Sequence, residues 1–232
     1  KIGNLFGSNF ITRWATRTWF YYENPILEQE ILGIKFKNPI GLAAGFDKNA
    51  KLTRIIPEVG FGFMELGSIT GRPCIGNEGQ HLWRLPKSKS LIVYYGLTND
   101  GAEQISGRLA TEKFTVPVGI SLAKTNDQET ITTEAGINDY LIAYQAFLRT
   151  GVGDYFTINI SCPNTFGGEP FVEAVRLDLL LSAFAKTREE FGHQRKPVFI
   201  KLPPDLDETK LDEIITLARK YKIDGFISAN LT

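Results

Sequence analysis

The sequence predicts an α/β protein in which short parallel strands alternate with longer helices, and two observations support this prediction. Short apolar runs that end in small or polar residues alternate with longer segments whose apolar residues lie three and four positions apart. A side chain able to take part in chemistry follows each apolar run. The first observation indicates repeated strand–helix units, which form either an open doubly wound sheet or a barrel. The second favours a (β/α)8 barrel, because active sites of such barrels gather at the C-terminal ends of the strands.

Six apolar runs after an aromatic N-terminal stretch are predicted to be strands. They are expected at residues 39–44, 61–67, 116–122, 155–160, 198–202 and 226–229. Helices that cover the sheet are expected at residues 138–148, 172–190 and 208–221. About six of the eight strand–helix units of a barrel therefore lie in this chain. Because the chain starts at Lys1 and stops beside the sixth strand, we expect it to be a fragment.

Charge and cysteine content limit the classes of function. The 26 basic and 26 acidic residues cancel, so no net field attracts nucleic acid, and a small ligand is the expected partner. Cys74 and Cys162 lie far apart with no histidine pair nearby, so neither a metal site nor a disulfide framework is expected, and a reducing cytoplasm fits best. The 232 residues contain neither a secretory signal nor an apolar run of the roughly 18 residues that cross a bilayer.

Each predicted strand leads to a polar or charged residue. In chain order these residues are Lys48, Ser68, Lys124, Asn159 with Cys162, Lys201 and Asn230. One lysine after a strand is usually a solvated loop charge, but six such positions in register indicate a single site. Small residues within 41–49 and 65–70 would let a flat ring system lie against the backbone, and the alternative is tight packing of strand on helix.

The segment 159–164 has the most specific pattern. Its carboxamides, Asn159 and Asn164, flank the thiol of Cys162 where a strand opens into a loop. Amides suit a planar polar ligand such as a pyrimidine-like ring, because each offers donors and an acceptor without a charge to desolvate. Cys162 can act as a base where neighbours lower its pKa, and the alternative is a buried cysteine beside turn residues. Neither His81 nor His193 lies at a strand end, so neither is assigned a catalytic role.

Four segments taken together resemble the dihydroorotate dehydrogenases. They are residues 38–48, 65–70, 159–165 and 224–230. The resemblance covers roughly residues 31–232, and residues 13–39 look like the beginning of the membrane-associated, quinone-using class. It implies an FMN-binding (β/α)8 barrel that oxidises dihydroorotate to orotate in pyrimidine synthesis and passes the electrons to quinone. It also implies peripheral association with the cytoplasmic face of the inner membrane.

The resemblance implies a role for each matching residue. The matches to flavin contacts are Ala43, Ala44, Gly45, Lys48, Gly67, Ser68, Asn159 and Lys201. The matches to substrate contacts are Lys48, Asn159, Asn164 and Asn230. Cys162 takes the position of the base that removes a proton from C5 of dihydroorotate while a hydride leaves C6. Lys201 would offset negative charge on the reduced flavin, and the alternative for it is a structural salt bridge.

Several positions depart from the family pattern. The quinone-using class generally has serine at the position of Cys162. The family usually has an asparagine that binds substrate at the position of Val93, an asparagine that contacts flavin at the position of Ser121 and a threonine at the position of Leu231. Loss of one buried amide contact costs about 1–3 kcal/mol of ligand binding. Two alternatives follow from these departures: a barrel that binds a ligand without turnover, and an FMN oxidoreductase that acts on a related dihydropyrimidine.

The chain is expected to have two parts, an N-terminal aromatic segment at residues 1–30 and the barrel at residues 31–232. Residues 10–22 mix aromatic side chains with Arg13 and Arg17. This mixture is typical of a segment at a membrane interface and equally of a helix packed against the barrel. The resemblance favours the membrane-facing interpretation.

Overall fold

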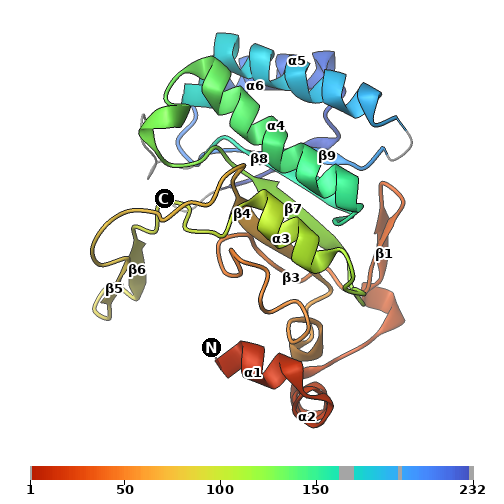
Figure 1. Ribbon diagram of the computed structural model, residues 1–232. Helices are drawn as coiled ribbons and strands as arrows, with labels where there is room; N and C mark the ends of the chain where they lie inside the picture. The colour runs from red at the N-terminus through yellow and green to blue at the C-terminus, as the bar shows by residue number, and fades with distance from the viewer. Residues whose placement is uncertain (1, 162–169, 193–194, 230–232) are drawn as a thin grey trace.

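The centre of the molecule is a parallel sheet, seen in a computed structural model that describes residues 2–161, 170–192 and 195–229. The sheet has six strands in the order β10-β9-β8-β7-β4-β3 (Figure 1). They are β3 (Gly41–Leu42), β4 (Phe63–Ile69), β7 (Val118–Leu122), β8 (Tyr155–Asn159), β9 (Val198–Lys201) and β10 (Gly225–Ile227). All six predicted strands are confirmed. Their order in the sheet follows their order in the chain, as in a barrel, whereas a doubly wound sheet reverses its order at a switch point.

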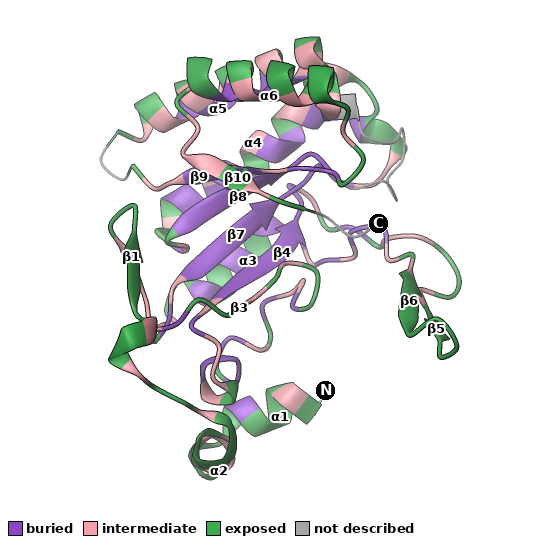
Figure 2. Cartoon of the chain, turned by 180° about the vertical axis from the view of Figure 1, so that it is seen from behind, coloured by how far each residue is buried: buried purple, intermediate pink, exposed green. Residues whose placement is uncertain are grey.

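Helices cover one face of this sheet (Figures 1 and 2). They are α3 (Ala102–Leu109), α4 (Thr133–Thr150), α5 (Ala174–Glu190) and α6 (Glu208–Lys220). The three predicted helices are confirmed, and α3 was not predicted. Helix α4 begins earlier than its apolar periodicity indicates, because the Thr132 side chain caps it by accepting a hydrogen bond from the Ala135 N–H. It ends at Gly151, whose φ of 72° lies in the left-handed region that glycine favours.

The two faces of the sheet differ in chemistry because side chains alternate along each strand. Apart from Ser68, which lies at the register shift in β4, the even-numbered residues on β4, β7, β8 and β9 are apolar, lie against the helices and are almost completely buried. They are Met64, Leu66, Val118, Ile120, Leu122, Phe156, Ile158, Val198 and Ile200. Odd-numbered residues face the concave interior of the barrel and include Glu65, Ser121, Tyr155, Asn159 and Lys201. The outer face therefore supplies the hydrophobic core, and the inner face supplies the polar groups.

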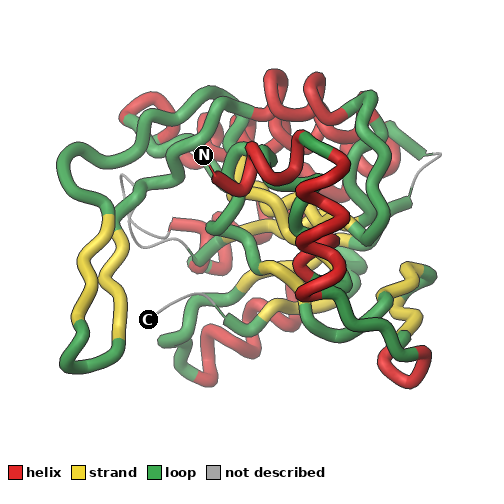
Figure 3. Tube along the Cα trace, turned by 90° about the horizontal axis from the view of Figure 1, so that it is seen from below, coloured by secondary structure: helices red, strands yellow, loops and turns green. Residues whose placement is uncertain are grey.

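The N-terminal segment contains two helices, α1 (Ile2–Ser8) and α2 (Phe10–Phe20), which lie below the sheet (Figure 3). Helix α2 packs beside the 3-10 helix at Pro57–Val59, where Arg17 pairs with Glu58 at 3.4 Å. Two antiparallel hairpins, neither of them predicted, complete the described chain: β1 (Gln29–Ile31) with β2 (Ile34–Phe36), and β5 (Leu82–Leu85) with β6 (Ser90–Val93). The division at residue 30 stays a prediction. None of the described helices is long and apolar enough to span a membrane.

Gly119 on β7 marks a point where the inner face has no room for a side chain. A Cβ atom at this position would lie 2.1 Å from the buried ring of Tyr155. We expect Gly119→Ala to lower the free energy of unfolding of the complete protein by about 2 kcal/mol, because the ring must move. The control is Gly107→Ala in α3, where nothing lies within 4 Å of the added methyl. At that position, alanine should raise the free energy of unfolding by about 0.5–1 kcal/mol, because alanine has a higher helix propensity than glycine. Urea unfolding that gave both variants the same stability would contradict this prediction.

Candidate active site

Three of the predicted site residues come together at the C-terminal ends of their strands. Asn159, the last residue of β8, lies in register with Lys201, the last residue of β9. The Asn159 side chain also reaches β4, where its Nδ2 donates a hydrogen bond to Ser68 Oγ at 2.7 Å. These two residues are 91 positions apart in the chain. The fold therefore joins the second, fourth and fifth predicted strands at one site.

Asn159 is held on both sides of its amide group. Its Oδ1 accepts hydrogen bonds from the backbone N–H of Ser161 at 3.1 Å and from Ser161 Oγ at 2.8 Å. Ser68 Oγ lies 2.7 Å from Ser121 Oγ on the neighbouring strand β7. All four side chains are buried, with Ser121 and Ser161 at 0% exposure. The amide is thus a fixed group, and Ser121 belongs to its surroundings.

A buried carboxyl group, Glu65, lies in the barrel interior near Lys201. Glu65 is 7% exposed, and Tyr155 Oη donates a hydrogen bond to its Oε2 at 3.3 Å. Burial raises the pKa of Glu65, and the positive charge of Lys201 opposes that rise. Burial also raises the pKa of Tyr155, so its hydroxyl stays protonated and can donate. Within the described residues, the Lys201 ammonium has no hydrogen bond or close ion pair, which leaves its donors available to a ligand.

The raised pKa of Glu65 predicts a pH-dependent stability. A carboxyl group whose pKa is higher in the folded than in the unfolded state lowers stability as pH rises between the two pKa values. We therefore expect the stability of Glu65→Gln relative to the parent to rise between about pH 4.5 and about pH 7.5. The measurement is urea unfolding at both pH values, with the exposed Glu190→Gln as control. A difference between parent and Glu65→Gln that stays constant with pH would show that Glu65 does not titrate in this way.

Lys48 is held beside the same site by contacts that include a hydrogen bond and a cation–π interaction. Its Nζ donates a hydrogen bond to the carbonyl oxygen of Gly45 at 2.7 Å. It also lies 4.0 Å from the centroid of the Tyr95 ring, within the range of a cation–π interaction. Tyr95 follows β6, so the β5–β6 hairpin orients a lysine that belongs to the loop after β3. This positions a cation at the edge of the site.

The small residues after β3 leave backbone accessible. Ala43 and Gly45 are exposed and Ala44 is half-buried. Gly45 has a φ of +105°, and nothing lies within 4 Å of where its Cβ atom would be. Its N–H donates to the carbonyl oxygen of Gly67 at 2.6 Å, which ties this loop to the end of β4. The two glycine-containing segments thus form one continuous surface, as a flat ligand requires.

The other residues named from the sequence fall into two groups, those outside the described residues and those with contacts of their own. Cys162, Asn164 and Asn230 lie outside the described residues, as does Leu231, so their predicted roles stay predictions. Lys124 is buried at 4% exposure and has partners of its own. Val93 pairs with Leu82 in the β5–β6 hairpin.

Sequence reasoning gave no role to Glu65, Tyr155, Tyr95 or Ser161. The one available signal was an acidic residue inside an apolar strand, Glu65 between Met64 and Leu66. Such a residue is rarely buried without a partner, which in this fold is supplied by Tyr155 and Lys201. The partners themselves lie on other strands, and nothing local to Glu65 identifies them.

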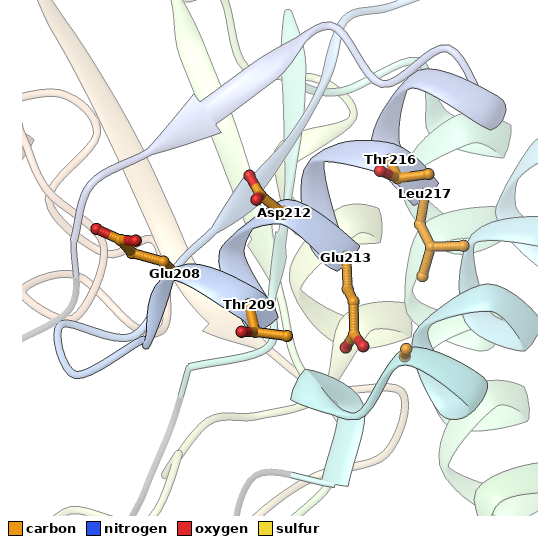
Figure 4. A pocket seen from close by; sticks show the side chains of 7 residues that line it. Glu208, Thr209, Asp212, Glu213, Thr216 and Leu217 are labelled. Atoms are coloured by element: carbon orange, nitrogen blue, oxygen red, sulfur yellow. The ribbon is translucent and has the colours of Figure 1, made fainter.

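A separate groove lies on the outer, helix-covered side of the barrel (Figure 4). It is lined by Ala174, Glu208, Thr209, Asp212, Glu213, Thr216 and Leu217. Its acidic side chains are carried by α6. None of the strand-end residues lines it, so it is not part of the candidate active site.

Comparison with known families decides the assignment. The sequence model of the family described as Dihydroorotate dehydrogenase matches residues 26–232. The chain belongs to the dihydroorotate dehydrogenase family. A dihydroorotate dehydrogenase (quinone) of Nostoc sp. (strain PCC 7120) is 40% identical over 214 residues, which cover 90% of this chain and 54% of the relative. One of Bartonella tribocorum is 40% identical over 209 residues, or 89% of this chain and 56% of the relative.

Solved structures of dihydroorotate dehydrogenases agree with this assignment. The Eimeria tenella enzyme in complex with ferulenol superposes with a TM-score of 0.78 at 27% sequence identity, over 96% of this chain and 65% of that structure. The ligand-free form superposes with a TM-score of 0.80 at 26% identity, over 100% of this chain and 69% of that structure. The predicted (β/α)8 barrel is thereby confirmed in part, with six strands present. The chain spans about half the length of the curated dihydroorotate dehydrogenases that it matches.

Proposed function

We propose that the complete protein binds FMN and oxidises dihydroorotate to orotate in pyrimidine synthesis, with quinone as the electron acceptor. The observation that carries this proposal is the group of hydrogen-bond donors at the strand ends, contributed by Lys48, Ser68, Asn159 and Lys201. Family membership indicates the reaction. The relatives named dihydroorotate dehydrogenase (quinone) support quinone as the acceptor.

The described residues fit FMN by their chemistry. The surface around Ala43, Ala44 and Gly45 is open backbone, against which a flat ring can lie. Asn159 and Lys201 each keep N–H groups that can donate further hydrogen bonds. The polar edge of the isoalloxazine ring carries carbonyl oxygens and ring nitrogens that can accept them. A positive charge at Lys201 suits a ring that gains negative charge when it is reduced. Donors on the protein therefore face acceptors on the ligand.

The site residues take different roles in the proposed reaction. Bound FMN supplies the hydride acceptor of the reaction. Cys162 removes the proton from C5 of dihydroorotate and holds it on its sulfur. Asn159, Asn164 and Asn230 hold the substrate ring through hydrogen bonds that need no charge. The roles of Cys162, Asn164 and Asn230 rest on the family pattern, since these three residues lie outside the described part of the chain.

The N-terminal helices favour an acceptor found in membranes. Phe10, Trp14 and Trp19 on α2 are 73%, 61% and 84% exposed, close to the basic side chains of Arg13 and Arg17. Exposed aromatic rings beside basic groups are typical of helices that lie in a membrane interface. We therefore propose peripheral membrane association for residues 1–30, at the cytoplasmic face of the inner membrane. Turnover with fumarate or NAD and none with a soluble quinone would contradict quinone as the acceptor.

The test of the proposed reaction is direct. The complete protein should purify with a yellow flavin, and anaerobic dihydroorotate should bleach that colour. Protein that stays colourless and takes up no added FMN would refute the proposal. Protein that binds FMN but is not reduced by dihydroorotate would instead support a barrel that binds without turnover, and reduction by another dihydropyrimidine alone would identify a different substrate.

A further inference from the structure

A buried chain of hydrogen bonds crosses three neighbouring strands below the candidate site. It runs from Ser121 on β7 to Ser68 on β4, and from there to Asn159 on β8. It continues from Asn159 to Ser161 at the start of the following loop. The exposed fractions of Ser121, Ser68, Asn159 and Ser161 are 0%, 5%, 7% and 0%, so water does not compete for these bonds. In such surroundings the hydrogen bonds fix the orientation of each group.

The partners of Asn159 determine which way its amide faces. On one side it meets the backbone N–H of Ser161, which can only donate, so that side must carry the amide oxygen. The other side then carries the NH2 group and needs an acceptor, which is Ser68 Oγ at 2.7 Å. A rotated amide would place its NH2 against the Ser161 N–H and lose that bond. How firmly the Asn159 NH2 group is held therefore depends on where the Ser68 hydroxyl oxygen lies.

Ser121 controls the position of that oxygen. Strand β7 lies between β4 and β8 in the sheet, so the Asn159 and Ser68 side chains meet above the inward-facing residue of the middle strand. The small Ser121 side chain leaves room for this meeting. Its hydroxyl lies 2.7 Å from Ser68 Oγ, which restrains the rotation of Ser68 about χ1. Without this contact, the Ser68 oxygen is free to leave Asn159.

We propose that Ser121 is a positioning residue that acts through Ser68 to hold the Asn159 amide ready to bind the pyrimidine ring of the substrate. The inference rests on the proposed function, because it takes that ring to be dihydroorotate or orotate. The resemblance to the family implies an asparagine at this position, and the present chain has Ser121 there, in contact with Ser68. A hydroxyl that only fills space would affect stability and leave ligand binding unchanged.

The experiment compares Ser121→Ala with Ser106→Ala in the complete protein. Ser106 is an equally suitable site for the same substitution, since it is 1% exposed and, among the described residues, its hydroxyl donates a hydrogen bond only to Glu103 O of its own helix, at 3.4 Å. Titration with orotate, followed by the absorbance of the bound flavin, measures the dissociation constant. We expect Ser121→Ala to weaken orotate binding about tenfold. The KM for dihydroorotate should rise by a similar factor with a smaller change in kcat, and Ser106→Ala should match the parent in both.

The same substitution made in the Ser68→Ala variant tests whether Ser121 acts through Ser68 or affects orotate binding directly. If Ser121 acts through Ser68, then adding Ser121→Ala to Ser68→Ala should change the orotate dissociation constant less than twofold, because coupled residues are not additive. A further tenfold loss in that background would overturn the proposed route. Orotate binding by Ser121→Ala equal to that of Ser106→Ala would overturn the positioning role with the proposed function intact. Failure of the parent itself to bind FMN or oxidise dihydroorotate would instead refute the proposed function.

Discussion

Cys162→Ala is expected to keep its FMN and to lose at least about a hundredfold in the rate of flavin reduction by dihydroorotate. A positioned general base contributes about 10²–10⁴-fold to a reaction that removes a proton from carbon. Apart from Asn159, the proposed flavin contacts lie on other segments, such as Ala43 to Gly45, Ser68 and Lys201, so the loss of the thiol should leave the cofactor in place. Anaerobic stopped-flow reduction, followed by flavin absorbance, measures the rate.

The pH dependence tests whether the base is the thiol itself. A free thiol has a pKa of about 8.5, and an aliphatic hydroxyl ionises several pH units higher. The reduction rate of the parent should therefore rise with pH and level off at a lower pH than the rate of Cys162→Ser, which keeps part of the activity. Cys74→Ala is the control, because Cys74 is buried and its hydrogen bond goes to the carbonyl oxygen of Gly96. If Cys162→Ala reduced its flavin as fast as the parent, Cys162 would be a packed thiol without a role as base.

Lys201→Met is expected to slow flavin reduction by about 10²–10³-fold with little change in stability. The Lys201 ammonium lies at the end of β9 beside Asn159, with no hydrogen bond among the described residues, so its removal breaks no internal contact of that kind. Its positive charge lowers the pKa of Glu65, and without it that carboxyl group can take up a proton. The interior therefore keeps no uncompensated charge, and the thermal midpoint should stay close to that of the parent.

The control for Lys201→Met is Lys186→Met, which removes an equal charge from the exposed side of α5. Single-turnover reduction and the reduction potential of the bound flavin are measured on both variants. We expect the potential to fall only in Lys201→Met, because a nearby cation favours the reduced, negatively charged ring. Unchanged reduction and potential in Lys201→Met would remove Lys201 from the mechanism and leave it as a solvated charge.

The sequence by itself determined the six strands of the central sheet and the residues that follow them. Apolar runs such as Tyr155–Asn159 repeat with period two, which places Phe156 and Ile158 on the helix side and Tyr155 and Asn159 on the inner side. Helical periodicity identified α4, α5 and α6, although only the cap at Thr132 shows where α4 begins. Segments 38–48 and 65–70 were sufficient, with the two later ones, to indicate the family that the comparisons confirmed. All of this information is local, because the period of a pattern depends on neighbours in the chain.

Only the tertiary structure decided which of these groups meet. Glu65 lies near Lys201, Lys48 lies on the Tyr95 ring, and Ser121 contacts Ser68, yet no pattern within any one segment predicts these pairs. Each pair depends on the register between strands or loops that are tens of residues apart, as the 53 positions between Ser68 and Ser121 illustrate. The register is set by packing of the apolar face against the helices, since a shift by one residue would exchange the two faces of a strand. The inner polar contacts are therefore consequences of packing on the opposite side of the same sheet.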